Sequence, residues 1–180
     1  MRIYRDKAFV EDTWKKIGDE EAIGEDSGNI VVSLARWRAE PDLATRANVG
    51  VLLRPGDEPG DDANALTKVP LIVITFAKFT DGRGYSIARL LRERYGFQGE
   101  IRATGEVLLD QIPLMLRCGF DAFEIVHGPT IASLERGHLP EIAYSYQRPT
   151  GSQRRYSTAV RSREGAFVTT REHGNGAGHA

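Results

Sequence analysis

The feature that most constrains the fold is an apolar run followed closely by an amphipathic segment. Residues 69–76 read V-P-L-I-V-I-T-F, and a run so uninterrupted is typical of a strand that is covered on both faces of a parallel sheet. Residues 85–95 then place Ile87, Leu90 and Leu91 at helical spacing, with charged side chains between them. Together the two segments predict a strand–loop–helix unit of an α/β fold.

The alternation of strands and helices continues on both sides of this unit. Short connections and right-handed crossovers then predict repeated β-α units in a mostly parallel sheet, either an open layered sheet or a partial β/α barrel. Pro113 falls inside one predicted helix, where we expect a kink or a restart that costs about 3 kcal/mol if unrelieved. The predicted strands are residues 30–34, 48–53, 69–76, 100–103 and 121–126, and the predicted helices are residues 85–95, 107–118 and 130–136.

The length of 180 residues fits one domain with flexible ends. Residues 1–29 are polar and finish in an acidic, glycine-containing run, which predicts a flexible or an edge segment. Residues 30–146 hold the alternating pattern and are predicted to form the single α/β domain. Residues 147–180 lose that pattern, and we expect an irregular, partly disordered tail.

Charge and composition exclude several classes of partner. The net charge is -1, so there is no basic excess to attract nucleic acid or an anionic membrane. The longest apolar stretch, near residues 69–77, is too short to span a bilayer, and the charged N-terminus does not read as a signal peptide. Cys118 is the only cysteine and cannot form an internal disulfide. We therefore expect a soluble cytoplasmic protein that binds neither nucleic acid nor membranes.

The best candidate site is the loop between the apolar strand and the amphipathic helix, K-F-T-D-G-R-G-Y-S at residues 78–86. Ligands of parallel sheets collect at the carboxyl ends of the strands, and glycines let a ligand approach the backbone closely. Lys78 and Arg83 would attract an anion, and Ser86 is expected to cap the helix. Alternatively, Asp81 simply pairs with Arg83 and the glycines serve only the turn. The candidate ligand-binding residues here are Lys78, Asp81, Gly82, Arg83, Gly84 and Ser86.

Two more polar residues on the following predicted helix join the candidate set. Asp110 and Gln111 are adjacent, and Gln111 lies on the apolar side, where its amide needs a partner. That partner is either a structural hydrogen bond or a ligand shared with the first loop. Glu124 lies inside an apolar strand and either faces solvent at an edge or needs a cationic partner. No residue is assigned a catalytic role.

Motifs for nucleotide, metal and nucleophile chemistry are missing from the sequence. There is no G-x-x-x-x-G-K-[ST] loop, no G-x-G-x-x-G fingerprint, no H-E-x-x-H or C-x-x-C pair and no G-x-S-x-G elbow. We therefore expect no cofactor and no metal.

Residues 76–123 read F-A-K-F-T-D-G-R-G-Y-S-I-A-R-L-L-R-E-R-Y-G-F-Q-G-E-I-R-A-T-G-E-V-L-L-D-Q-I-P-L-M-L-R-C-G-F-D-A-F. This run resembles a bacterial family of proteins of unknown function. Residues 32–37 and 49–53 add weaker likeness. Members are labelled probable oxidoreductases of sulfite reduction because they are encoded beside sulfite reductase. The chain departs from the family where F-P-K-F is usual, since residue 77 is alanine, and where aspartate is usual, since residue 106 is glutamate.

The resemblance implies an accessory protein of assimilatory sulfite reduction that binds a small oxyanion, sulfite reductase or another sulfate-assimilation enzyme. A stand-alone sulfite reductase would need a haem-type centre, an iron–sulfur cluster or a flavin. One cysteine and no nucleotide fingerprint make this chain a poor redox catalyst by itself. Two alternatives stay open: a small-molecule enzyme with its site at the strand carboxyl ends, and a non-catalytic interaction module.

Overall fold

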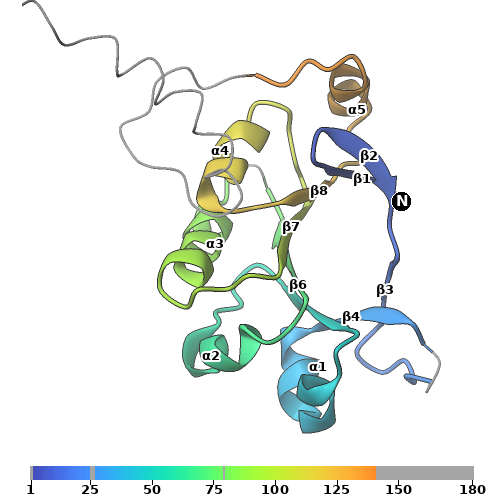
Figure 1. The fold of residues 1–180 in the computed structure, drawn as a ribbon, viewed down its shortest axis with the longest axis vertical. Coiled ribbons are helices and arrows are strands. Elements are labelled where there is room, and N and C mark those ends of the chain that lie inside the picture. The colour runs from blue at the N-terminus through green and yellow to red at the C-terminus, as the bar shows by residue number, and fades with distance from the viewer. Residues whose placement is uncertain (1, 25–26, 79, 141–180) are drawn as a thin grey trace, which may run out of the picture.

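A computed structural model describes residues 2–24, 27–78 and 80–140 of the chain. These residues build one eight-stranded sheet, ordered β2-β1-β8-β7-β6-β5-β4-β3, which curls into a half-barrel with the helices on its outside (Figure 1). The strands are β1 Arg2–Arg5, β2 Ala8–Glu11, β3 Trp14–Lys16, β4 Asn29–Ser33, β5 Val49–Leu53, β6 Leu71–Phe76, β7 Glu100–Gly105 and β8 Ala122–Glu124. The helices are α1 Leu34–Ala39, α2 Ala63–Leu66, α3 Arg83–Glu93, α4 Ile112–Cys118 and α5 Gly128–Glu135, with short 3₁₀ turns at Pro41–Thr45 and Gly60–Asp62.

The predicted β-α units are present from β4 onward. The apolar run forms β6, which pairs in parallel with β5 on one side and β7 on the other. Both faces of β6 are covered, as its unbroken apolar sequence requires, with five of its six residues buried. Gly96 and Gly119 adopt positive φ angles of 67° and 103° just after α3 and α4, where a left-handed residue commonly ends a helix.

The sheet is mixed, which corrects the prediction of a mostly parallel one. Strands β3 to β8 are parallel neighbours, but β1 pairs antiparallel with both β2 and β8. The β1–β2 hairpin turns through Asp6 and Lys7, both at positive φ, as a two-residue hairpin turn requires. Of the two alternatives for residues 1–29, the described part has the edge segment, because β2 and β3 are the two edges of the sheet. The predicted tail, residues 147–180, lies outside the described residues.

The chain itself bridges the open side of the half-barrel. β2 ends at Glu11 beside Arg2 of β1, and β3 begins at Trp14 beside Asn29 of β4. Only residues 12–13 separate them, so one nearly continuous stretch runs from one edge of the sheet to the other (Figure 1). We call residues 8–16 the closing segment.

Alternation along the strands separates an outer, helix-covered face from an inner, concave face. On β6, Ile72, Ile74 and Phe76 belong to the large core that contains the buried side chains of the helices. Leu71 and Val73 point the other way and form a small inner cluster with Val31. Alternate residues along each strand therefore lie on opposite faces of the sheet, one set outward and the other inward.

Pro113 does not kink a helix, because α4 begins at Ile112 rather than at residue 107. Pro113 falls in the first turn, where the missing N–H has no partner to lose and the fixed φ favours helix initiation. The predicted cost of a helix-interior proline therefore does not arise. In the described part of the chain, no helix is long and apolar enough to cross a membrane.

Candidate functional site

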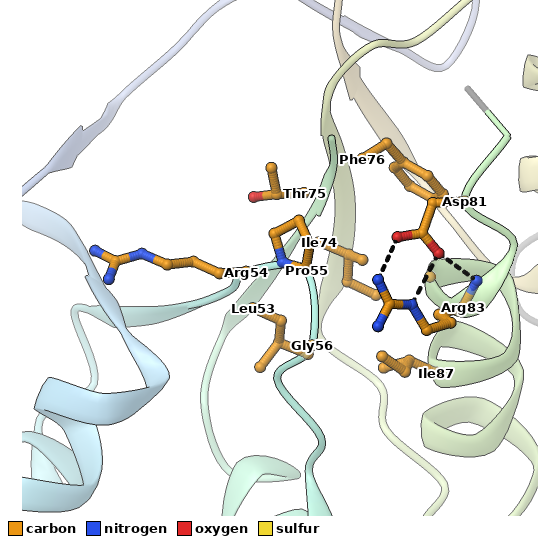
Figure 2. A pocket seen from close by; sticks show the side chains of 11 residues that line it. Leu53, Arg54, Pro55, Gly56, Ile74, Thr75, Phe76, Asp81, Arg83 and Ile87 are labelled. Atoms are coloured by element: carbon orange, nitrogen blue, oxygen red, sulfur yellow. Dashed lines mark hydrogen bonds and ion pairs between the residues drawn. The ribbon is translucent and has the colours of Figure 1, made fainter. Parts of the chain in front are cut away.

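The predicted loop after β6 is occupied by its own ion pair. Asp81 Oδ1 accepts hydrogen bonds from the Arg83 backbone N–H at 3.1 Å and from Arg83 Nε at 3.0 Å, and Asp81 Oδ2 accepts one from Nη2 at 2.8 Å (Figure 2). The side-chain and backbone hydrogen bonds from Arg83 lower the pKa of Asp81 to about 2. This is the structural alternative that the sequence left open, in which Asp81 and Arg83 bind each other.

The two glycines of the loop have different roles. A Cβ on Gly84 would lie 2.6 Å from Cζ of Phe76 and 3.1 Å from Cγ2 of Ile74, whereas a Cβ on Gly82 would meet nothing within 4 Å. Gly84 therefore allows α3 to pack directly on β6. Ser86 does not cap the helix, because α3 begins at Arg83 and Ser86 is an exposed residue in its first turns.

A shallow hollow lies where the loop meets the ends of β5 and β6 (Figure 2). It holds about 270 Å³ of empty space, which includes open solvent. Of the predicted residues, the hollow brings together Asp81, Arg83 and Gly84. The others, Lys78, Gly82, Ser86, Asp110 and Gln111, do not line it.

Gln111 and Asp110 lie just before α4 instead of within it. Gln111 Oε1 accepts a 3.3 Å hydrogen bond from the backbone N–H of Leu108, which gives the amide a structural role. Asp110 is exposed. The pKa of Tyr85 is raised to about 12, first by burial and then by the negative charges of Cys118 and Asp110. Asp110 therefore lies near Tyr85, on the outer, helix-covered side of the sheet.

Ion pairs between distant strands also cross the inner face of the sheet. Lys16 Nζ of the closing segment donates to both carboxylate oxygens of Glu124, at 2.9 and 2.7 Å. The Glu124 side chain is 4% exposed, so its charge is held inside the fold by this one cation. Of the two alternatives for Glu124, the structure has the cationic partner.

A second set of ion pairs ties the closing segment to β7. Arg102 binds Asp12 at 2.8 Å and Glu100 at 2.8 Å, and Glu100 also accepts a 2.9 Å hydrogen bond from Arg5. Arg102 and Asp12 are 90 positions apart, so no local pattern could have joined them. The alternation of Arg102 with buried Ile101 and Ala103 was the one available signal for an inward-facing charge.

The side chains at this edge do not form a metal-binding cluster in the described part of the chain. In residues 2–24, 27–78 and 80–140, no group of three or more His, Cys, Asp or Glu side chains is arranged to hold a metal ion. The polar groups that the fold does bring together are cations, carboxylates and hydroxyls at the strand ends. Such a set binds charged small molecules by hydrogen bonds and ion pairs.

A family of bacterial proteins of unknown function, DUF934, matches residues 50–164. The chain belongs to this family. The DUF934 match contains the loop at residues 78–86 and strands β6, β7 and β8, and it begins after the closing segment. No curated protein and no solved structure matches the chain.

Proposed function

We propose that this DUF934 protein serves assimilatory sulfite reduction as an accessory protein that binds a small oxyanion at the carboxyl edge of its parallel strands. Two lines support the proposal. The stretch within residues 76–123 resembles proteins encoded beside sulfite reductase. The carboxyl ends of β4 to β8 share one edge of the sheet, which is where parallel α/β folds collect their ligands.

One observation carries the preference for an anion. Three ion pairs at this edge leave the cation more exposed than its carboxylate partner: Lys16 is 40% exposed against 4% for Glu124, Arg54 is 52% against 43% for Asp19, and Arg83 is 66% against 21% for Asp81. Arg54 follows β5 directly, and Lys16 contacts the last residue of β8. At each of these pairs an approaching molecule meets the cation before the carboxylate, which favours an anion there.

Growth on defined sulfur sources tests the physiological role. We expect deletion of the gene in its bacterium to slow growth on sulfate or sulfite and to leave growth on sulfide or cysteine normal, with recovery on complementation. Equal growth of deletion and parent strains on all four sources would reject a role in sulfite reduction.

Sulfite reductase is the proposed partner, and the cytoplasm is the proposed location. The full chain, immobilised under physiological salt, is expected to retain sulfite reductase from a lysate of the same bacterium. The retained reductase should be released by excess free chain. Absence of the reductase from the eluate would remove this partner, while an oxyanion-binding function would still stand on its own test.

A small-molecule enzyme with its site at the same edge is the second candidate function. It is favoured by the hollow at the ends of β5 and β6, because enzymes with parallel α/β sheets have their sites at this edge. Incubation of the protein with sulfite separates the two functions. The accessory role predicts that sulfite is recovered unchanged, whereas an enzyme that acts on sulfite alone would convert it.

A further inference from the structure

Two threonine hydroxyls lie side by side at the inner carboxyl edge of the sheet. Thr75 of β6 and Thr104 of β7 are direct partners in the parallel register. Their sequence neighbours Ile74, Phe76 and Ala103 belong to the outer core, so alternation places both threonine side chains on the inner face. Neighbouring strands are about 4.8 Å apart, which brings the two hydroxyls within reach of one small molecule.

Charged side chains continue this row on both sides. Ala103 pairs with Phe123, so the next residue on each strand sets Glu124 beside Thr104. Leu53 pairs with Ile74, so Arg54 follows beside Thr75. Figure 2 shows the Arg54 side chain extending away from Thr75 as well as from the Asp81–Arg83 pair, and its Nη1 binds Asp19 at 3.0 Å. We call the set Glu124, Thr104, Thr75 and Arg54, together with Lys16 bound to Glu124, the inner row.

The inner row has more hydrogen-bond donors than acceptors to receive them. Within the described residues, neither threonine hydroxyl has a hydrogen-bond partner, although Thr104 is only 7% exposed. Among the described residues, the Lys16 side chain donates hydrogen bonds to Glu124 alone and has a third N–H, and the Arg54 side chain donates only from Nη1, to Asp19 at 3.0 Å. Lys16 neutralises Glu124 through both carboxylate oxygens. Thr104 is the nearly buried member of the set, and a polar group at such a position is normally paired, so its hydroxyl is the one that calls for a partner.

We propose that the inner row binds a small tetrahedral oxyanion, with hydrogen bonds from Thr75 and Thr104 and positive charge from Arg54 and Lys16. Sulfate or phosphate offers four oxygens against the two of a carboxylate, which suits a set of several donors. This inference rests on the proposed oxyanion binding and assigns it to the inner face. In the outer loop at residues 78–86, Asp81 already accepts hydrogen bonds from the backbone N–H, Nε and Nη2 of Arg83, so fewer donors are left for a ligand there than at the inner row.

Calorimetric titration of the full chain tests the site with sulfate, phosphate and acetate at constant ionic strength, balanced with chloride. The wild type is expected to bind sulfate or phosphate saturably and acetate weakly. Thr75→Val and Thr104→Val remove one hydroxyl each while keeping the side-chain shape. Each is expected to weaken binding about tenfold, the effect of one lost hydrogen bond to a charged group.

Matched variants separate the inner row from the rest of the surface. Lys16→Gln should weaken binding, whereas Lys15→Gln makes the same charge change at the adjacent position, whose side chain pairs with Glu21 instead, and should leave affinity unchanged. Arg83 lines the same hollow as Thr75 and Arg54 but is held by Asp81, so Arg83→Gln is expected to weaken binding less than either valine variant. Circular dichroism melts without added anion verify that each variant is folded. The two valine variants decide the outcome if Lys16→Gln is too unstable, because they leave every ion pair in place.

Three results would overturn the site. The first is that neither sulfate nor phosphate binds saturably. The second is that both valine variants bind with affinities within twofold of wild type. The third is that Arg83→Gln alone loses binding. Failure here is distinguishable from failure of the physiological role. A growth defect without inner-row binding keeps the role in sulfite reduction and removes the site, whereas binding without a growth defect keeps the site and removes the role.

Discussion

Gly84 is the residue of the predicted loop at which the absence of a side chain matters most for stability. In Gly84→Ala, the new Cβ would meet Phe76 at 2.6 Å, and Phe76 is fully buried and unable to move aside freely. Overpacking of this kind costs about 1–3 kcal/mol, which outweighs the gain of about 1 kcal/mol in helix propensity. Urea unfolding of Gly84→Ala should therefore give a lower free energy of unfolding than wild type.

Gly82→Ala is the matched control for that experiment. Gly82 has a negative φ of −78°, and its added Cβ would meet nothing within 4 Å, so we expect a change of about 1 kcal/mol or less. Equal destabilisation by both substitutions would show that the loop, rather than the contact between α3 and β6, sets the requirement for glycine.

Tyr85 should make stability depend on pH in alkaline solution. Its pKa is raised from 10.0 to about 12, first by burial and then by Cys118 and Asp110. Between these values the unfolded chain loses the phenol proton while the folded chain keeps it, so stability falls as pH rises from about 10 to 12. Tyr85→Phe keeps the ring beside Phe76 and removes this component. Wild type should lose up to about 2 kcal/mol more than the variant over this interval in urea unfolding.

Comparing how the free energy of unfolding changes with pH in wild type and in Tyr85→Phe separates the contribution of Tyr85 from that of other titrating groups. Burial also raises the pKa values of Tyr4 and Cys118, but both are present in wild type and variant alike. Parallel stability curves for the two proteins above pH 10 would contradict the raised pKa of Tyr85.

At the scale of elements, the closing segment is held to the sheet by buried ion pairs. Asp12→Asn removes the charge that Arg102 faces at 2.8 Å, and both side chains are nearly buried. Arg102 keeps Glu100, so we expect a loss of about 1.5–3 kcal/mol in the free energy of unfolding, the scale of one charged hydrogen bond. Asp42→Asn, at an exposed position, serves as the control and should change stability by less than about 0.5 kcal/mol. An Asp12→Asn variant as stable as that control would mean that the pair does not hold the closing segment.

The elements that the sequence predicted are those whose local pattern determines them. β4 to β8 have short apolar or β-branched runs, α3 has apolar residues at helical spacing and α5 has a proline near its start, and all are present within a few residues of their predicted bounds. The strands before residue 29 could not be located in this way. Their positions depend on distant partners, such as Glu124 for Lys16 and Arg102 for Asp12, and a polar sequence with such partners looks like a loop.

The candidate site shows the same difference between residues that are adjacent in the sequence and residues that only the fold brings together. The outer loop was found because its charges and glycines are adjacent in the sequence, and the structure shows that its ion pair is internal. The inner row was missed because its members are spread from Lys16 to Glu124 and meet only through strand register. The available signal was the alternation of side chains along the strands, which puts Thr75 and Thr104 at inward-facing positions near the ends of β6 and β7.

At the scale of the whole molecule, one short N-terminal stretch determines what the inner face contains. It supplies both edges of the sheet and carries Asp12 and Lys16 to the strands on the far side of the curl (Figure 1). The carboxyl edge therefore has two different sides: an outer loop in which Asp81 and Arg83 bind each other, and the inner row of hydroxyls and cations. Oxyanion binding at the inner row is the proposal that this arrangement supports.

Methyl-resolved NMR of the full chain during a sulfate titration tests that claim most directly, because each threonine has one assignable methyl group. The methyl signals of Thr75 and Thr104 should shift together and saturate, with the Arg54 side-chain Nε–H, while the amide signals of residues 81–86 remain in place. Shifts confined to residues 81–86, or no saturable shift of either threonine methyl, would contradict oxyanion binding at the inner row.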